Sequence, residues 1–256
     1  MIHFVGAGSG AKDLITVRGE RLLKEADVVI YAGSLVNPEL LSETKEGCRI
    51  YNSAKMTLPE VIAVMEQAEA EGKMTVRLHT GDPSIFGAVR EQMDLLDGKG
   101  ISYEVCPGVS SFCGAAASLH VELTLPEVSQ TVIITRMAGR TAVPERESFR
   151  SLAAHHATMA VFLSAGLLTE MEEELRLAGY PKDTPAAIVY KATWPEEKKI
   201  RCTVSTLAET AEKEGIKKTA MIFIGDVLGT REENGYADSR LYAPDFSTEY
   251  RKGTDG

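Results

Sequence analysis

Short apolar segments alternate with helix-length segments through the first half of this chain, and no other feature of the sequence constrains its fold as strongly. The segments expected to form strands are Ile2–Val5, Asp27–Tyr31, Met74–His79 and Ser102–Cys106. The segment before the third of them begins with Thr57-Leu58-Pro59-Glu60, a capping box with proline in the first turn, and continues with apolar residues at helical spacing. Because parallel strands need a long crossover, usually a helix, this order predicts an α/β domain with a mostly parallel sheet.

The second half starts a new series of expected strands after an aperiodic segment. These strands are Thr131–Thr135, Thr158–Leu163, Ala186–Tyr190, Ile200–Val204 and Ala220–Ile224. The third and fourth of them follow too closely for a helical crossover, so we expect an antiparallel pair and a mixed sheet. The sequence therefore predicts an N-terminal α/β domain over 1–119, a linker over 120–128, a C-terminal α/β domain over 129–228 and an extension over 229–256.

Composition and charge argue against several classes of function. The net charge is −9, and no basic stripe is present to neutralise phosphates, which argues against nucleic-acid binding. No apolar run approaches the ~18 residues of a membrane span, and the start of the chain lacks the pattern of a signal peptide, so we expect a cytoplasmic protein. The 4 cysteines are scattered, without CxxC spacing or nearby histidines, which predicts reduced thiols and no metal site.

The turn Gly6-Ala7-Gly8-Ser9-Gly10 directly follows the first expected strand. Strand, glycine turn and helix is the layout that brings backbone N–H groups to a ligand at the carboxyl edge of a parallel sheet. Three details argue against a dinucleotide: the third glycine comes one position early, the helix begins only after Ala11-Lys12-Asp13, and the acidic Asp27 starts the second strand instead of ending it. From these residues alone, a tight chain reversal without a ligand stays an alternative to a binding turn.

Three further motifs accompany this turn in order. They are RLHTGDPSIFG at Arg77–Gly87, VCPGVSS at Val105–Ser111 and LTLP at Leu123–Pro126. With the turn they resemble the tetrapyrrole methylase family over roughly residues 1–228. The first motif of that family usually reads G-x-G-P-G-D, and here Ser9 and Ala11 stand at the proline and aspartate positions.

Other stretches make the chain most similar to those members of the family that methylate C11 of precorrin-4 or cobalt-precorrin-4. They are Leu14–Gly19, Tyr31–Val36, Ser129–Arg136 with Gly139–Thr141, and Val189–Pro195. The resemblance implies a methyltransferase of cobalamin biosynthesis, dependent on S-adenosyl-L-methionine, with S-adenosyl-L-homocysteine as product, and it implies a homodimer. The alternatives are a family member acting on another precursor such as uroporphyrinogen III, and a non-catalytic adenosylmethionine-binding regulator.

The resemblance also implies where the cofactor is held: in a cleft between the two domains, by residues that follow strand ends. The matching residues are Ser9, Thr80, Gly81, Asp82, Ile85, Ser110, Ser111, Leu163, Ser164 and Ala192. Glycine permits close backbone approach, a carboxylate complements a positively charged ligand, and amides at a helix start can meet a carboxylate.

A corrin precursor has many carboxylates, so a protein of net charge −9 needs local cations to bind it. The candidates for substrate binding are Arg18, Arg136, Arg140 and Lys191. Methyl transfer from a sulfonium needs alignment and exclusion of water more than acid–base catalysis, so no catalytic residue is predicted. His79, Glu91 and Glu122 are the available candidates for a general base, and structural roles are the better interpretation of each.

Overall fold

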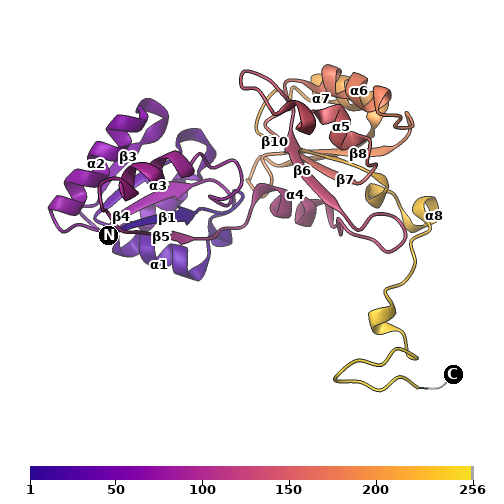
Figure 1. Ribbon diagram of the computed structural model, residues 1–256, viewed down its shortest axis with the longest axis horizontal. Helices are drawn as coiled ribbons and strands as arrows, with labels where there is room; N and C mark the ends of the chain where they lie inside the picture. The colour runs from indigo at the N-terminus through magenta and orange to yellow at the C-terminus, as the bar shows by residue number, and fades with distance from the viewer. Residues whose placement is uncertain (255–256) are drawn as a thin grey trace. The chain divides into compact units, whose positions relative to one another are not determined.

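A computed structural model describes residues 1–254 of the chain, which form two compact units. The first unit comprises Met1–Ser118 and the short segment Lys191–Glu197, and the second comprises Leu119–Tyr190 and the residues from Lys198 onward. Each unit has its own five-stranded sheet (Figure 1). The predicted fold class, one parallel and one mixed sheet, is confirmed.

All strand pairs of the first sheet are parallel, in the order β3-β2-β4-β1-β5. The strands are β1 (Ile2–Gly6), β2 (Val28–Tyr31), β3 (Arg49–Asn52), β4 (Thr75–His79) and β5 (Tyr103–Cys106). Strands β1 and β4 lie next to each other near the middle and are buried along their whole length. Because the strands are parallel, the segments that follow β1, β4 and β5 all begin at the same edge of the sheet.

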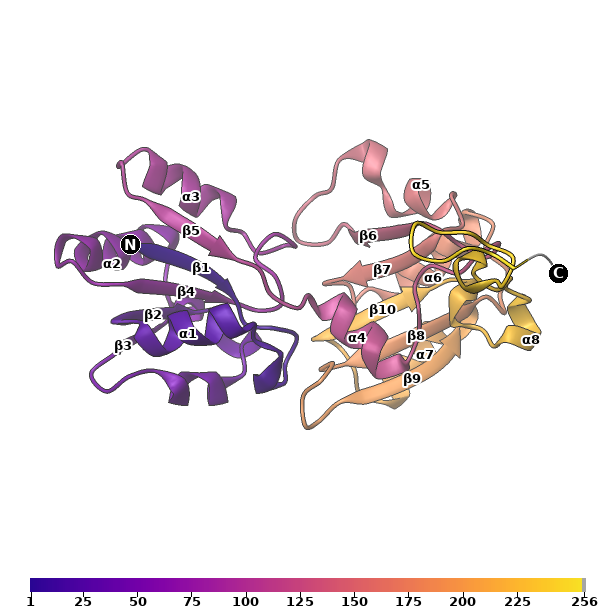
Figure 2. The same cartoon turned by 90° about the horizontal axis from the view of Figure 1, so that it is seen from below.

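Helices cover both faces of the first sheet (Figure 2). Helix α1 (Val17–Glu25) packs on one face, and α2 (Leu58–Ala70) and α3 (Arg90–Asp97) pack on the other. The predicted capping box is present, since the N–H and hydroxyl of Thr57 donate to the Glu60 carboxylate at 2.7 and 2.8 Å. Helix α4 (Ser111–Leu119) follows β5.

The second sheet is mixed, in the order β6-β7-β10-β8-β9. Its strands are β6 (Val132–Arg136), β7 (Thr158–Phe162), β8 (Pro185–Tyr190), β9 (Lys198–Thr203) and β10 (Ala220–Ile224). Only β6 and β7 pair parallel; β8 and β9 pair antiparallel, as their close spacing predicted. The core of this unit lies under α5 (Phe149–Ala153), α6 (Leu168–Leu177) and α7 (Leu207–Lys213).

The structure differs from the sequence-based expectations in two places. Strand β3 was not predicted, because this edge strand has only four residues and a half-exposed, polar sequence without an apolar run. Helix α3 was expected from Gly87 but begins at Arg90, since Phe86 and Ala88 have positive φ angles of 53° and 49°, which a helix cannot contain.

The predicted linker and extension have little regular structure. In the linker region, Leu125 and Ser129 form an isolated antiparallel bridge. The extension predicted over 229–256 contains the short helix α8 (Arg231–Asn234) and a 3-10 turn at Arg240–Tyr242, and its last two residues lie outside the described part of the chain. Among residues 1–254, no helix has the length and apolar character needed to cross a membrane.

Candidate functional site

Three loops meet at the carboxyl edge of the first sheet, and they contain the glycine motifs. The turn after β1 and the segment after β4 pair through Gly8 and Gly81, whose amides each donate to the other's carbonyl at 3.3 and 2.8 Å. The Ala7 amide donates to the His79 carbonyl at 2.7 Å and extends this pairing. The two motifs therefore form one backbone platform.

The glycines are required by the closeness of these backbones. A Cβ on Gly6 would lie 2.6 Å from the Gly108 Cα and 2.6 Å from the Gly81 carbonyl oxygen. Gly81 itself has a φ of +60°, a left-handed conformation that side chains disfavour. The first, second and third motifs thus contribute one glycine each to a single contact.

Asp82 joins the second motif to the third. Its Oδ2 accepts from the Gly108 amide at 2.8 Å, and its Oδ1 accepts from the Ser84 amide at 2.8 Å and from the Ser84 hydroxyl. Partial burial of the carboxylate acts to raise the pKa of Asp82, but the hydrogen bonds from Ser84 and Gly108 outweigh it and lower the pKa. Asp82 therefore places a fixed negative charge beside the loops, with lone pairs still available on its oxygens.

Ser9 and Ala192 lie together in the first unit, because the segment Lys191–Glu197 packs there. The buried Ser9 hydroxyl is 3.0 Å from the Thr193 Oγ1, to which the Ala11 amide also donates at 3.0 Å. A Cβ on Gly10 would lie 2.7 Å from the Ala192 carbonyl oxygen.

The remaining residues predicted for this unit also lie at these loops. Ser110 is buried directly before α4, and its carbonyl accepts from the Gly114 amide at 3.1 Å. Ser111 lies against Gly81, since a Cβ on Gly81 would be 3.3 Å from the Ser111 nitrogen. Ile85 donates its amide to the Asp82 carbonyl at 3.3 Å, and Thr80 is partly exposed next to Gly81. The structure thus brings Ser9, Thr80, Gly81, Asp82, Ile85, Ser110, Ser111 and Ala192 to one edge of the first sheet.

In the second unit, Leu163 and Ser164 follow β7. Leu163 has a φ of 53° and is 70% exposed, an uncommon conformation and an uncommon exposure for a leucine. The buried Ser164 hydroxyl donates to the Phe162 carbonyl at 2.7 Å and accepts from the Met137 amide at 2.9 Å. This hydroxyl therefore ties the end of β7 to the segment that follows β6.

The cationic residues are placed unequally. Two guanidinium nitrogens of Arg136 donate to the carbonyls of Met137, Thr141 and Ala142 at 3.2, 3.1 and 2.7 Å, so this side chain orders the loop that contains the exposed Arg140. Arg18 is exposed in the first turn of α1. The Lys191 ammonium pairs with Glu196 at 3.1 Å and lies 5.3 Å from the centre of the Trp194 ring.

The candidate bases fit structural roles. Glu91 and Glu122 are exposed, whereas His79 is buried on β4. Burial, and then the charge of Arg77, lower the pKa of His79 to about 3. Arg77 is itself buried, donating to Gln92 and to the Ile30 carbonyl at 3.1 Å each, and burial lowers its pKa to about 10.

The sequence and the geometry are shared with a known family. The model for Tetrapyrrole (Corrin/Porphyrin) Methylases matches residues 1–208. The chain belongs to this family. The resemblance inferred from the motifs is thereby confirmed.

Individual relatives of this family match most of the chain. A cobalt-precorrin-4 C(11)-methyltransferase of Methanocaldococcus jannaschii is 55% identical over 98% of this chain and 96% of its own. The X-ray structure of a cobalt precorrin-4 methyltransferase superposes with a TM-score of 0.88 at 48% identity, over 90% of this chain and 96% of that one. A uroporphyrin-III C-methyltransferase from Thermus thermophilus, crystallised with S-adenosyl homocysteine, gives 0.74 at 28% identity over 89% and 93%.

Two residues that hold the glycine turn of this methylase fold were not assigned a role from the sequence. The sequence places Thr193 in one of the motifs without predicting a role for it, and it predicts no role for Asn37. The Asn37 side-chain amide donates to the Gly10 carbonyl at 2.9 Å in a buried position. The only local signal was Asn37-Pro38, a helix cap followed by proline, and it does not point to Gly10.

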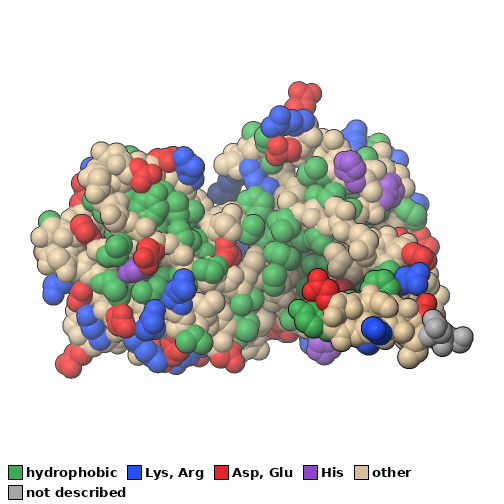
Figure 3. Space-filling model, turned by 60° about the horizontal axis from the view of Figure 1, so that its bottom comes forward, with side chains coloured by type: hydrophobic (Ala, Val, Ile, Leu, Met, Phe, Trp, Pro, Cys, Tyr) green, Lys and Arg blue, Asp and Glu red, His purple; other side chains and the backbone are tan. Residues whose placement is uncertain are grey.

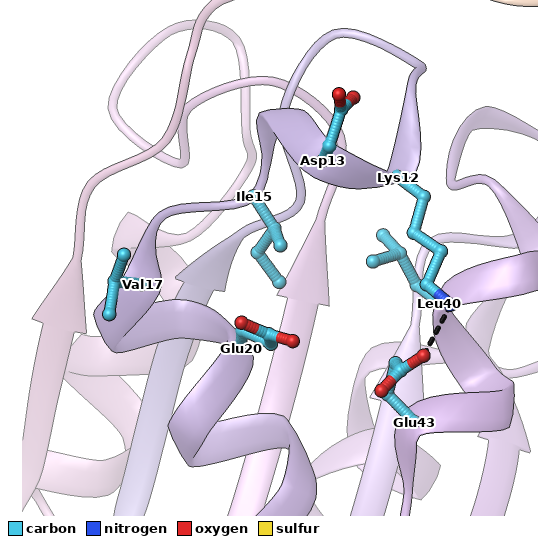
Figure 4. A pocket seen from close by; sticks show the side chains of 7 residues that line it. All are labelled: Lys12, Asp13, Ile15, Val17, Glu20, Leu40 and Glu43. Carbon is cyan, nitrogen blue, oxygen red and sulfur yellow. Dashed lines mark ion pairs between the residues drawn. The ribbon is translucent and has the colours of Figure 1, made fainter.

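The first unit of the methylase also has a half-open pocket of about 400 Å³ beside the glycine turn (Figure 4). It is lined by Lys12, Asp13, Ile15, Val17, Glu20, Leu40 and Glu43. Lys12 points to Glu43 and pairs with it, while Asp13 points away. None of its lining residues is among those that the resemblance assigns to cofactor or substrate binding.

Charged side chains of both signs are intermingled on the face of the methylase that Figure 3 shows, without a continuous basic stripe on that face.

The described residues contain no group of three or more His, Cys, Asp or Glu side chains arranged to hold a metal ion. Asp27, the acidic residue considered for a dinucleotide site, directly precedes β2. Its carboxylate accepts from the Met74 amide at 2.8 Å and pairs with Lys45. It therefore lies at the amino edge of the sheet, whereas the glycine turn lies at the carboxyl edge.

Proposed function

We propose that this protein is an S-adenosylmethionine-dependent methyltransferase that adds a methyl group at C11 of cobalt-precorrin-4, or of its metal-free counterpart precorrin-4, in cobalamin biosynthesis. The observation that supports this function most directly is the 55% identity, over 98% of the chain, to a cobalt-precorrin-4 C(11)-methyltransferase. The 28% identity to the uroporphyrin-III enzyme favours the corrin precursor over uroporphyrinogen III.

The loops of the first unit suit S-adenosylmethionine in the chemistry of their groups. The ionised Asp82 complements a positively charged ligand, and it is held in place by Gly108 and Ser84 instead of being free to move. Amides at the start of α4, next to Ser110 and Ser111, can receive the methionine carboxylate. Leu163 and Ser164 are the proposed contacts from the second unit. The cofactor supplies a methyl group already activated by the sulfonium.

The work of the protein's own residues is then binding, orientation and exclusion of water. Attack of an electron-rich ring carbon on the methyl carbon would break the bond from sulfur to that methyl group and release S-adenosyl-L-homocysteine, and it would need no strong base. This agrees with the absence of an apt base among the three candidates: His79 is buried with a pKa of about 3, and Glu91 and Glu122 are exposed.

The carboxylates of the substrate require cations, and the loop after β6 provides the best candidates. Arg136 holds this loop through three carbonyls, and Arg140 is exposed on it. We assign Arg140 to direct contact with a substrate carboxylate and Arg136 mainly to the shape of the loop, with Arg18 and Lys191 as further cations. The homodimer and the cytoplasmic location are further parts of the proposal, to be tested by light scattering and by cell fractionation.

The experiment is methyl transfer from isotope-labelled S-adenosylmethionine to cobalt-precorrin-4, precorrin-4 and uroporphyrinogen III, followed by mass spectrometry. We expect one labelled methyl group on a precorrin-4 substrate, at C11, and none on uroporphyrinogen III. Methylation of uroporphyrinogen III alone would assign the chain to another substrate of the family. Binding of S-adenosylhomocysteine without transfer to any of the three would support the regulator instead.

A further inference from the structure

The segment Lys191–Glu197, which connects β8 to β9, packs with the first unit through its threonine hydroxyl. The Thr193 Oγ1 accepts from the Ala11 amide at 3.0 Å and lies 3.0 Å from the Ser9 hydroxyl. One side chain therefore bonds to both ends of the three-residue turn Ser9–Ala11. A hydroxyl has one proton and two lone pairs, so these two partners use most of its capacity.

The segment is itself held in a defined conformation. The Thr193 amide donates to the Glu197 carboxylate at 2.6 Å, and the Ser118 hydroxyl donates to the same oxygen. Thr193 has a φ of 66°, a conformation that is unfavourable for a β-branched residue. Such a conformation persists only when its surroundings determine it, as the Glu197 contacts do here.

The middle of the turn is enclosed from two directions. A Cβ on Gly10 would lie 2.5 Å from the indole nitrogen of Trp194, while the Gly10 carbonyl accepts from Asn37 at 2.9 Å. Ser9 packs against α4, since a Cβ on Gly114 would lie 2.6 Å from the Ser9 Cβ. The buried Ser9 hydroxyl thus lies among groups of the protein, with Thr193 as its hydrogen-bond partner.

We propose that Thr193 is a positioning residue: its hydroxyl bonds with Ser9 and Ala11 fix the glycine turn in the shape that binds the cofactor. The Ser9 hydroxyl serves this bond and does not contact the ligand. This inference rests on the proposed function for the identity of the ligand and revises the role that the sequence assigned to Ser9. Cofactor affinity then depends on Thr193, whose hydroxyl bonds to Ser9 and Ala11 and not to the cofactor.

The test compares S-adenosylhomocysteine binding by calorimetry among full-length variants. Ser9→Ala removes one hydrogen bond of the turn, and we expect it to weaken binding about fivefold; Thr193→Val removes that bond and the one from the Ala11 amide, and we expect it to weaken binding at least as much. Because Thr193→Val removes both bonds of this hydroxyl, the double variant should bind no more weakly than Thr193→Val alone. Thr193→Ser keeps the hydroxyl and should bind as the wild type does. Thr131→Val, the same change at an exposed position of the second unit, is the control.

Ser9→Pro separates turn shape from ligand contact. Proline stiffens the turn without a hydroxyl, it is the usual residue of the related motif, and the Ser9 amide donates no hydrogen bond to any described residue. We expect Ser9→Pro to bind S-adenosylhomocysteine within about twofold of the wild type, in contrast to Ser9→Ala. If Ser9→Pro binds as weakly as Ser9→Ala while Thr193→Val binds normally, the hydroxyl contacts the ligand and the proposal is wrong. Additive losses in the double variant would also overturn it.

A ligand-free measurement keeps this inference separate from the proposed function. Trp194 is the chain's 1 tryptophan, so acrylamide quenching of its fluorescence reports on the segment against Gly10. Quenching should increase in Ser9→Ala and Thr193→Val and stay at the wild-type level in Thr193→Ser. If the wild type binds no S-adenosylhomocysteine, the proposed function fails, and quenching still decides whether the hydroxyl holds the turn. Unchanged quenching in Thr193→Val would refute that role.

Discussion

His79 makes the stability of the first unit sensitive to acid. Its ring lies on β4, 3% exposed, 6.1 Å from the Phe4 ring centre, and its Nε2 has no hydrogen-bond partner among the described residues. Burial, and then the charge of Arg77, lower its pKa from 6.5 to about 3. Between these two pH values the unfolded chain binds a proton that the folded chain does not, so stability is complete above pH 6.5 and is lost as the pH falls.

The size of the loss follows from the difference in pKa. Each pH unit below 6.5 costs about 1.4 kcal/mol until the folded pKa is reached, so the free energy of unfolding should fall by about 2 kcal/mol by about pH 5. In His79→Gln this contribution is absent. The difference in the free energy of unfolding between the wild type and His79→Gln should therefore change by the same amount over this pH range. The comparison also cancels the contribution of His3, whose pKa is lowered by burial as well.

Urea unfolding followed by Trp194 fluorescence measures this unit specifically, because Trp194 belongs to it. His155→Gln, the same substitution at an exposed histidine, is the matched control. We expect the curves of stability against pH for the wild type and His79→Gln to converge or cross as the pH falls. Curves that stay parallel from about pH 7 to about pH 5 would mean that His79 takes up its proton in the folded state, and the reasoning from burial would be refuted.

Three other predictions concern the loops. Gly108→Ala should destabilise the first unit by about 2 kcal/mol or more, since its Cβ would lie 2.7 Å from the Gly6 Cα; urea unfolding measures this, and a stability within error of the wild type contradicts the close contact. Asp82→Asn should weaken S-adenosylmethionine binding about tenfold with an unchanged circular dichroism spectrum, because it removes the fixed charge that complements the positively charged ligand; equal affinity would exclude a role for that charge. Arg136→Ala should speed proteolysis of the loop Met137–Ala142, because it removes the hydrogen bonds that order the loop. It should also raise the KM for the tetrapyrrole about tenfold with kcat little changed. Faster proteolysis with an unchanged KM would show that the loop takes no part in substrate binding.

The order of strands and helices was predictable because it depends on local patterns. Apolar runs identified nine of the strands, the exception being the half-exposed β3. The short connection between β8 and β9 showed that these two strands pair antiparallel. The meeting of the motifs after β1, β4 and β5 at one edge also follows from a parallel sheet. These features need no knowledge of which side chains touch.

The contacts within the site were predictable only in part, because they depend on distances between remote segments. The sequence indicated that the glycine turn and Gly81 allow close approach, but not that Gly6, Gly81 and Gly108 approach one another. The resemblance predicts that Asp82 binds the ligand; the structure shows that its carboxylate also links two motifs through Gly108. Arg136 was interpreted as a substrate contact, yet its donors meet carbonyls of its own loop.

The glycine turn shows why such residues escape a reading of local sequence. The spacing of its glycines indicates a backbone that comes close to another group. A dinucleotide site, a tight chain reversal and a methylase cofactor site are all compatible with that spacing. What gives the turn its shape lies far along the chain, at Thr193, Trp194 and Asn37. A turn held from outside by two bonds of one hydroxyl can lose its binding shape without losing any glycine. Substitutions at Thr193 should therefore weaken cofactor binding, although its hydroxyl stays bonded to Ser9 and Ala11.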